Sequence, residues 1–506
     1  MHGKISFFGD STAELFTREL DESLSGVLER NFIRSDDVNL NGFVTASIDG
    51  RPWYDTMWSR DAGVFLRELV SWGYIQEASL LAENLIRLVR LNPKGYYTFP
   101  MYFKMGCPGQ GSELDGTCSV IIGLALLWER VDAGAPVKEI VEEFLFGGKS
   151  PLYYITEMLE GSPLIPGSGE FGGGMGVDGE YYNAVQNFLV YYALTISARI
   201  AGLSGNERLK NLCEDKASGL IRNIERYFIG SDNTWTWCVD TNSLKPDQAV
   251  LNAKANKGFS GINGIAAMYG DVLGLDPCGE QWPYAAVCEA TFDRLLNFPK
   301  SREQYDKYGI YIQFQSLCNG LLTSPSYGQG YALQTSLLLN RFHETDKLIA
   351  YLTEATYKPP AGYKLDRYSG FHFYERLLSP DYFTMLPDDR EETDQGCGAL
   401  NLVNVAEPLK IARLIAGIDD TSSRVLRIIP RLPEAWQGVV VSDWPVLCGG
   451  KLLTLNMRFE RNASPVMLSL SLDGIAPMIE VILYGRDGSR MVYKFYDCDK
   501  LDLELN

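Results

Sequence analysis

The sequence is poor in histidine and in basic charge. Its 506 residues include only three histidines, and 46 lysines and arginines stand against 64 aspartates and glutamates, which gives a formal net charge of -18. Nucleic acids and anionic membrane surfaces are bound through clustered basic side chains. The charge balance therefore argues against both as partners, and a neutral or polyhydroxylated substrate fits better.

Metal and cofactor motifs are also missing. The histidines stand at positions 2, 343 and 372, and the sequence has no HExxH motif and no Walker loop. The glycines at 172–174 do not follow a strand, as a dinucleotide-binding turn would require. We therefore expect neither a metal ion nor an organic cofactor.

Cysteine pairs and long apolar runs are absent as well. The ten cysteines are scattered, with no CxxC pair and no cluster with histidine, which favours free thiols in a reducing compartment. The first residues lack a basic segment followed by a long apolar one, and no window approaches 18 uninterrupted apolar residues. We expect a cytoplasmic protein that does not span a membrane.

Helical periodicity dominates most of the chain. Many of the expected helices come in pairs joined by short turns, and longer loops rich in glycine, aromatic and acidic residues lie between other helices, at 91–115, 161–180, 298–329 and 357–399. Long ordered loops are uncommon in a compact domain unless they are functional, and loops gathered at one end of a helical barrel would form a cleft. The helices are expected at 13–30, 61–73, 75–90, 116–132, 137–146, 150–160, 181–202, 206–228, 260–274, 280–296, 330–341, 344–356 and 400–417.

The pattern changes after about residue 418. Short runs there alternate apolar and polar residues and are broken by glycine, proline and aspartate, which is typical of antiparallel strands. We predict three units: an N-terminal segment at 1–52 that packs on the barrel, a helical barrel at 53–423, and a β-sandwich-like domain at 424–506.

The stretch 53–73 brings aromatic rings and charges to the start of a helix. Trp58, Arg60 and Asp61 stand just before an apolar run with helical spacing. Aromatic rings stack on the apolar face of a sugar, and a carboxylate with a guanidinium binds paired hydroxyls. The stretch therefore fits a carbohydrate site. A capped helix with a surface ion pair and core tryptophans is the structural alternative.

Two further acidic stretches precede helices. Asp115 stands near the expected helix start at Gly116, where it could bind a ligand or cap the helix. Glu170 lies in a stretch, 166–180, in which seven of fifteen residues are glycine, and Glu180 begins the next helix. Dense glycine lets the backbone approach a ligand, and a desolvated acid has a raised pKa and can donate a proton. A surface loop with an incidental glutamate is the alternative.

A fourth acidic stretch lies ahead of the last barrel helix. Glu391, Glu392 and other acids crowd between 388 and 394. Such a run is usually a solvated face. The small residues at 396–399 also allow one carboxylate to point into a cleft as a base. Two acids from distant loops, about 6.5–9.5 Å apart, are what inverting glycoside hydrolysis needs.

The helix-pair pattern resembles a known superfamily. With WSRDAGVFLRELVSWGYIQEA at 58–78, it looks like the (α/α)6-barrel, or six-hairpin, glycoside hydrolases, and in particular glucoamylases. That resemblance implies that Arg60 and Asp61 bind sugar hydroxyls in the −1 subsite. ELDGT at 113–117 resembles a following acidic motif. GSGEFGGG at 167–174 and the helix after it resemble the region that carries the catalytic acid in glucoamylases, debranching enzymes and trehalase-like glucosidases.

The end of the barrel resembles a second family. Residues 396–446 are similar to the last barrel helix and C-terminal β-domain of α-L-rhamnosidases. The chain departs from both patterns. Glucoamylases have a tryptophan and paired glutamates where this chain reads Gly-Glu-Phe at 169–171. Rhamnosidases carry Ser-x-Asn-His where this chain reads Ala-Leu-Asn-Leu at 399–402, so rhamnose is not implied.

The resemblance implies a mainly α fold, an (α/α)6 toroid barrel with a small C-terminal antiparallel β-domain, and hydrolysis with inversion. We predict an exo-acting glycoside hydrolase for an α-linked neutral hexose in an oligosaccharide or glycoside. A phosphorylase on the same barrel and a non-catalytic carbohydrate-binding protein are the alternatives.

Two glutamates are predicted to catalyse the reaction and five residues to bind the substrate. Glu170 is the general acid and Glu392 the general base, with Glu391 and Glu375 as further candidates for the base. Substrate would be bound by Trp58, Arg60, Asp61, Asp115 and Glu180, and Glu180 is also the second choice for the acid.

Overall fold

The computed structural model describes most of the chain. The described residues are 2–47, 55–91, 95–109, 111–167, 181–246, 274–279, 284–297, 314–315, 322–357, 376–378, 402–422, 424–461 and 465–505.

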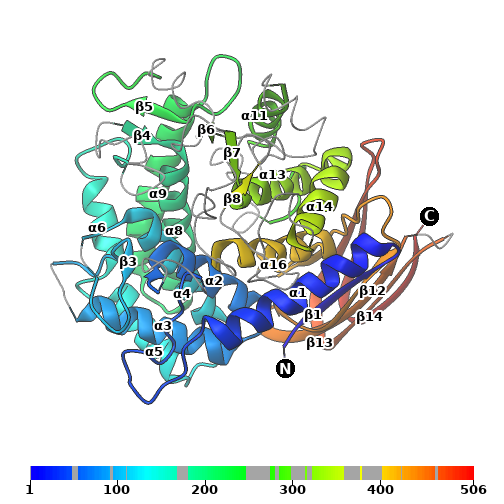
Figure 1. Ribbon diagram of the computed structural model, residues 1–506, viewed down its shortest axis with the longest axis horizontal. Coiled ribbons are helices and arrows are strands. Elements are labelled where there is room, and N and C mark those ends of the chain that lie inside the picture. Colours follow the sequence, from blue (N-terminus) through cyan, green and yellow to red (C-terminus); the bar gives the residue numbers. More distant parts are fainter. Residues whose placement is uncertain are drawn as a thin grey trace, which may run out of the picture.

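Helical hairpins arranged as a ring make up the larger part of the described chain, and a sheet lies against one side of the ring (Figure 1). The predicted helix at 260–274 falls almost wholly outside the described residues, whereas the other predicted helices are present with shifted ends. The helices are α1 (Ser11–Arg30), α2 (Ser59–Ser71), α3 (Ile75–Arg90), α4 (Leu114–Arg130), α5 (Pro136–Phe146), α6 (Pro151–Met158), α8 (Ala184–Leu203), α9 (Glu207–Phe228), α11 (Ala285–Asn297), α13 (Ser326–Leu338), α14 (Phe342–Tyr357) and α16 (Leu402–Ala416).

Burial separates the inner helices from the outer ones. α13, α16, α2, α4 and α8 pack side by side in that order, and α3, α9 and α14 lie against their outer faces. α8 buries residues on nearly all sides, as a helix surrounded by others must. α9 buries a single stripe that includes Leu209, Cys213, Leu220 and Ile224. This amphipathic stripe is why α9 belongs to the outer layer.

Glycine lets the two inner helices α2 and α4 approach closely. A Cβ atom on Gly63 of α2 would lie 2.6 Å from backbone atoms of Ser119 and Val120 in α4. A Cβ atom on Gly123 would lie 2.9 Å from Leu66 Cδ2. Any larger side chain at these positions would push the helices apart, so the glycines hold the first turns of α2 and α4 near each other.

Short strand pairs precede several inner helices. β2 (Met57–Trp58) pairs with β3 (Tyr102–Phe103) ahead of α2, and β4 (Tyr181–Asn183) pairs with β5 (Cys238–Asp240) ahead of α8. β6 (Phe314–Gln315), β7 (Leu322–Pro325) and β8 (Arg376–Leu378) form a third small sheet ahead of α13. The prediction of a helix from residue 181 is wrong at its start, because Asn183 caps α8 through a bond from the Gln186 amide.

A seven-stranded sheet contains the C-terminal strands. Its order is β1-β11-β12-β13-β10-β9, with β14 also paired to β13. The pairings are antiparallel except that of β10 with β13. The strands are β1 (Lys4–Phe8), β9 (Ile418–Asp419), β10 (Leu426–Ile428), β11 (Gly438–Cys448), β12 (Lys451–Glu460), β13 (Val466–Tyr484) and β14 (Arg490–Leu505).

The N-terminal segment contributes to both parts of the molecule. β1 pairs along β11 at the edge of the sheet, while α1 packs on α14 and α16 of the barrel (Figure 1). The C-terminal strands of the sheet begin at Ile418. The division at residues 52 and 423 stays a prediction.

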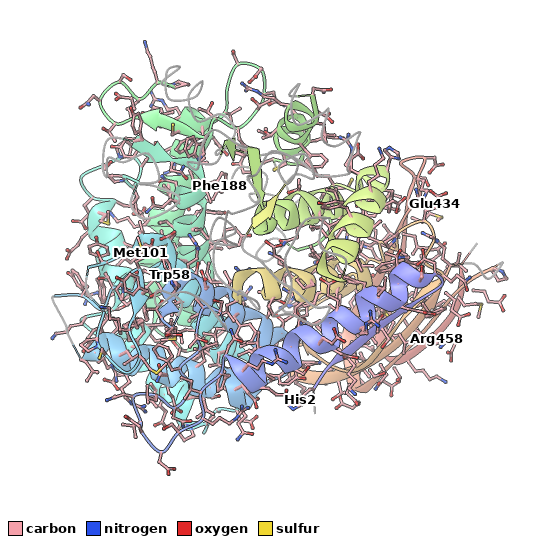
Figure 2. The ribbon with its side chains drawn as sticks, viewed as in Figure 1. His2, Trp58, Met101, Phe188, Glu434 and Arg458 are labelled. Carbon is pink, nitrogen blue, oxygen red and sulfur yellow. The ribbon has the colours of Figure 1, made fainter. Side chains whose placement is uncertain are left out.

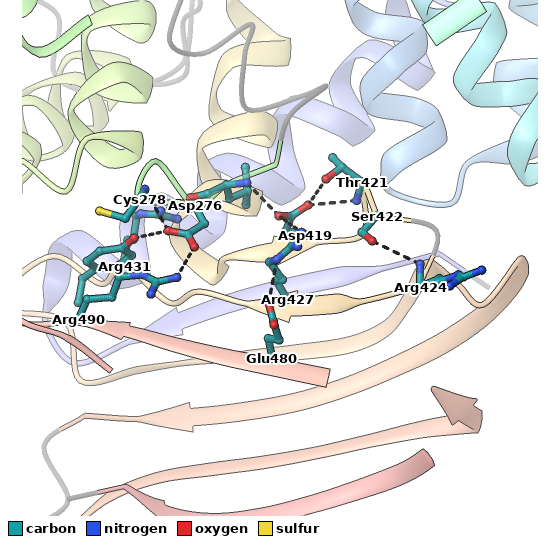
Figure 3. A network of polar contacts seen from close by, with 12 residues as sticks. Asp276, Cys278, Asp419, Thr421, Ser422, Arg424, Arg427, Arg431, Glu480 and Arg490 are labelled. Atoms are coloured by element: carbon teal, nitrogen blue, oxygen red, sulfur yellow. Dashed lines mark hydrogen bonds and ion pairs between the residues drawn. The ribbon is translucent and has the colours of Figure 1, made fainter. Parts of the chain in front are cut away.

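Polar side chains join the barrel to the sheet (Figure 3). Asp419 accepts hydrogen bonds from the Leu275 amide at 2.9 Å and from the Thr421 hydroxyl at 2.6 Å. Asp276 accepts from the Tyr484 hydroxyl and from Arg490, the latter at 2.5 Å. We call this group, together with Arg427, Arg431 and Glu480, the junction network. It ties the segment at 274–276 to strands of the sheet.

Arg431 is the most buried cation of the junction network, with 1% of its surface exposed. It donates to Asn340 Oδ1 at 2.8 Å and to the backbone carbonyls of Leu275 and Ile429. Burial lowers its pKa to about 10, so the guanidinium is still charged at neutral pH.

Within the described part of the chain, no helix is at once long enough and apolar enough to cross a bilayer.

Candidate functional site

Three predicted binding residues meet where α2 and α4 begin. Arg60 and Asp61 are the second and third residues of α2, and Asp115 is the second residue of α4. Arg60 Nη1 lies 3.5 Å from Asp115 Oδ2, and Arg60 Nε lies 3.7 Å from Asp61 Oδ1. The guanidinium therefore lies between two carboxylates that come from different helices.

This charged group is largely withdrawn from solvent. Asp115 is fully buried and Asp61 is 5% exposed, while 14% of the Arg60 side chain remains exposed. Partial positive charge at a helix N-terminus favours carboxylates there, and burial strengthens their interaction with the guanidinium. The pKa of the Cys118 thiol is raised, first by burial and then by the negative charge of Asp115. The site is thus a largely buried charged group in which the cation is partly accessible.

Asp115 is not the N-cap of α4, which was the structural alternative for this residue. Glu113 is the N-cap residue of α4, and Asp115 lies inside the first turn, where its Oδ1 accepts from the Gly116 amide at 2.9 Å. A Cβ atom on Gly116 would lie 3.0 Å from Ser59 Cβ and 3.3 Å from the Arg60 amide nitrogen. Because Gly116 has no side chain, Asp115 and Arg60 can lie close together.

Glu113 is a buried carboxylate that the predicted site left out. It is 4% exposed, and its Oε2 would lie 3.3 Å from a Cβ atom on Gly116. Its amide donates to the Phe99 carbonyl at 2.7 Å. The signal was present in the sequence, since Glu113 stands two residues before Asp115 in the same acidic motif.

Aromatic and apolar side chains stand beside the charged group. The Trp58 ring lies against the Tyr102 ring with centroids 5.5 Å apart and planes 41° apart. Tyr102 and Met101 are each 38% exposed, and Figure 2 shows Met101 beside Trp58 near the start of α2. Trp58 is thus placed as predicted. Tyr102 was missed, because nothing in the residues around it predicts a two-residue strand.

Backbone contacts fix the loop that carries these side chains. The Ser59 hydroxyl donates to the Pro100 carbonyl at 2.6 Å, and the Ser59 amide donates to the Met101 carbonyl at 3.0 Å. The Thr117 hydroxyl accepts from the Phe99 amide at 2.9 Å. The loop before α4 is therefore attached to the first turns of both helices. This attachment fixes the positions of the aromatic and charged groups relative to each other.

The predicted acid and base lie outside the described residues. This holds for Glu170 and Glu180, for Glu392, and for the further candidates Glu391 and Glu375. The described residues that flank 168–180 lie together, since the Gly167 amide donates to the Tyr181 carbonyl at 2.7 Å. The side chain of Asn187 adds two hydrogen bonds here. Its Oδ1 accepts from the Ile165 amide at 2.8 Å, and its Nδ2 donates to the Ile165 carbonyl at 3.0 Å. Both flanks are thus fixed directly before α8.

The start of α16 is fixed near the start of α2. The Leu402 amide donates to the Ala46 carbonyl at 2.9 Å, and the Ala46 amide donates to the Thr56 carbonyl at 2.9 Å. Leu402 is the first residue of α16, and Thr56 stands shortly before α2. The first residue of α16 is therefore tied, through Ala46, to the residues that lead into α2.

No metal site is formed by the described side chains, because no three of their His, Cys, Asp or Glu groups are placed to hold an ion. The eight cysteines in the described ranges are all free thiols.

Comparison with known proteins identifies the fold. No protein-family model and no curated protein matches the sequence. Among solved structures, an α-L-rhamnosidase from Aspergillus terreus is 12% identical with a TM-score of 0.57, and the match covers 100% of this chain and 50% of that one. The fold is that of the six-hairpin glycosidases.

Two further structures show the same likeness. An α-L-rhamnosidase from Streptomyces avermitilis, solved in complex with L-rhamnose, is 14% identical with a TM-score of 0.54, over 98% of this chain and 42% of that one. A glucoamylase from Saccharomycopsis fibuligera is 14% identical with a TM-score of 0.54, over 81% of this chain and 96% of that one. The chain thus spans about half the length of these rhamnosidases or less.

The six-hairpin fold confirms the predicted fold class, a mainly α toroid barrel with a C-terminal β-region. It also confirms the resemblance to glucoamylases and rhamnosidases at the level of the fold. Identities this low carry no information about the substrate.

Proposed function

We propose that this protein is an exo-acting, inverting glycoside hydrolase that removes an α-linked neutral hexose from an oligosaccharide or glycoside. One observation carries the proposal. Arg60 lies between Asp61 and Asp115, two residues after Trp58, where two inner helices of a glycosidase-type fold begin.

The described residues suit the terminal sugar ring. The separations of 3.5 and 3.7 Å between Arg60 and the two carboxylates exceed the usual hydrogen-bond range of about 2.7–3.2 Å. Sugar hydroxyls can bond to the carboxylates and the guanidinium at a small electrostatic cost. Trp58 offers a flat apolar surface for the face of the ring. Asp61 and Asp115 would accept hydroxyl protons, and Arg60 would donate to hydroxyl oxygens.

The bond-breaking step needs one proton donor and one proton acceptor. In the proposal, Glu170 protonates the glycosidic oxygen as the bond to the anomeric carbon breaks. Glu392 takes a proton from a water molecule whose oxygen attacks that carbon from the opposite face. Glu180 is the second choice for the acid, and Glu391 and Glu375 are the alternatives for the base. The step requires no cofactor, and the free thiols favour the cytoplasm as its place.

A substrate screen tests the proposal. The full chain is incubated with aryl glycosides and disaccharides of neutral hexoses, with and without inorganic phosphate, and free sugar and sugar 1-phosphate are measured. Phosphate-independent release of a terminal hexose is expected. Release of sugar 1-phosphate only when phosphate is present would establish a phosphorylase instead. Saccharide binding without any turnover would establish a non-catalytic protein.

A further inference from the structure

A pocket of about 370 Å³ lies beside the loop that precedes α4. That volume falls in the range of about 300–1,000 Å³ that is typical of small-molecule sites. Its walls come from the last turn of α3, from the loop and from α6, and they include the side chains of Tyr96, Thr98, Pro100, Phe103, Ser112 and Tyr154. Among the described residues, none to which the proposed function assigns a role lines it.

Strand β3 separates this pocket from the candidate active site. Side chains of successive strand residues point to opposite faces. Tyr102 lies against Trp58, whereas the next residue, Phe103, lines the pocket and is fully buried. The two sites therefore lie on the two faces of one strand.

The pocket wall is fixed before any ligand arrives. The Tyr97 amide donates to the Lys149 carbonyl at 2.8 Å, which ties the start of the loop to the residues before α6. The Tyr97 ring stacks on Phe144 with centroids 5.6 Å apart. A wall that is already ordered loses little conformational entropy on binding, so such a pocket can hold a small ligand.

The described residues of the lining are uncharged and combine aromatic rings with hydroxyls. Tyr96 and Tyr154 present rings with centroids 6.4 Å apart, and Thr98 and Ser112 add hydroxyl groups. The Tyr96 hydroxyl donates to Glu157, and this bond is the main reason that the Tyr96 pKa is raised, so the ring stays neutral. An uncharged lining has little affinity for ions, while rings and hydroxyls together suit a ligand with an apolar face and a polar rim.

We propose that this pocket binds a neutral saccharide unit, as a second carbohydrate site distinct from the subsite formed by Arg60, Asp61 and Asp115. The choice of a saccharide rests on the proposed function, because saccharides are the substrates of a glycosidase. The existence of the pocket and its neutral lining do not depend on it.

The test is saccharide binding to the full chain, measured by saturation-transfer NMR and calorimetry with maltose, lactose and sucrose. The background variant is Asp115→Asn, which weakens the candidate active site. Ser112→Trp places a large ring into the pocket from an exposed position, and Tyr154→Ala removes one aromatic wall. Tyr154→Phe is the matched control, because it keeps the ring. Melting curves verify that each variant is folded.

The expected result is that at least one of the three sugars binds to the Asp115→Asn protein. Ser112→Trp should abolish that binding, and Tyr154→Ala should raise Kd about tenfold, whereas Tyr154→Phe should change it by less than about threefold. Absence of binding of all three sugars, or binding that Ser112→Trp and Tyr154→Ala leave unchanged, would overturn the proposal.

Hydrolysis by the wild-type chain is scored separately. Hydrolysis together with sugar binding that the pocket variants do not alter refutes the pocket and leaves the proposed function intact. Pocket binding without hydrolysis refutes the proposed function and supports the pocket.

Discussion

Two buried groups of arginine and aspartate lie in this protein, and they are built differently. In the junction network, Arg490 lies 2.5 Å from Asp276, and Asp419 accepts from the Thr421 hydroxyl at 2.6 Å. At the start of α2 and α4, Arg60 lies 3.5 Å from Asp115 and 3.7 Å from Asp61. The junction network also has one long pair, Arg427 and Asp419 at 3.7 Å, but its contact between Arg490 and Asp276 is 1.0 Å shorter than that between Arg60 and Asp115.

The partners explain the difference. Arg431 donates to two backbone carbonyls and Asp419 accepts from the Leu275 amide, so the junction network is completed by the fold itself. Arg60 is instead paired with two carboxylates, Asp61 and Asp115, at 3.7 and 3.5 Å, and 14% of its side chain is exposed. Hydrogen bonds to backbone groups suit a network that holds the sheet against the barrel. The longer contacts of Arg60 with Asp61 and Asp115 suit a site that binds and releases a ligand. Four experiments test these assignments.

The largest effect is expected from the proposed acid and base. Glu170→Gln and Glu392→Gln should each lower kcat by about 10²- to 10⁴-fold, because an amide of the same shape neither donates nor accepts the proton. Melting temperatures should stay at the wild-type value. Near-native turnover in either variant would remove that residue from its role, and the same substitution at Glu180, Glu391 and Glu375 would then identify the alternative.

Asp115→Asn should lower kcat/KM by about 10²-fold, because it weakens a buried contact to Arg60 and to the sugar hydroxyls. Steady-state kinetics on the best substrate measure this. The matched control is Asp232→Asn, since Asp232 forms a solvent-exposed ion pair with Arg294 at 3.2 Å. The control should keep wild-type kcat/KM. Equal activity of the two variants would mean that the charged group at α2 and α4 does not bind substrate.

Arg431→Met should lower the free energy of unfolding by about 3–5 kcal/mol, because it leaves Asn340 and two buried carbonyls without their donor. Urea denaturation measures the loss, and kcat/KM per folded molecule should not change. Arg458→Met is the control, since the Arg458 side chain is 56% exposed and its ion pair with Glu460 is worth less than about 1 kcal/mol. A loss of activity without a loss of stability would show that the junction network is not merely structural.

The smallest effect concerns Glu407, a buried residue of α16 whose pKa is raised well above its usual value, first by burial and then by Glu19 of α1. A raised pKa in the folded state gives stability that is complete below the unfolded pKa, near 4.5, and that is lost as pH rises through the folded pKa. Glu407→Gln removes this dependence.

The Glu407→Gln variant should therefore melt at the wild-type temperature near pH 4 and about 2 °C higher near pH 8, as measured by differential scanning calorimetry. A difference of the same size at both pH values would show that folding does not raise the pKa of Glu407.

Local sequence signals predicted part of the site. Trp58, Arg60 and Asp61 were found because charged and aromatic residues stand at the start of an apolar helical run, and the structure places them there. Asp115 was found from its position before a helix, although its contact with Arg60 depends on Gly63, Gly116 and Gly123. Glycine at such positions allows two helices to pack closely, but the sequence does not show which other helix packs against the glycine.

Long-range pairings were not predictable from local signals. Tyr102 lies against Trp58 only because β3 pairs with β2, and neither two-residue strand has a recognisable pattern. β1 joins the C-terminal sheet through β11, from the far end of the chain. Both features depend on tertiary contacts that a sequence window does not contain.

The most direct test of the proposed mechanism is the anomeric configuration of the sugar at the moment of release. Proton NMR follows the anomeric signals during the first turnovers of the best α-linked substrate, before mutarotation equalises them. Two carboxylates acting through a water molecule should release the β-anomer first. First release of the α-anomer would contradict a water-activating base and with it the proposed pairing of Glu170 with Glu392.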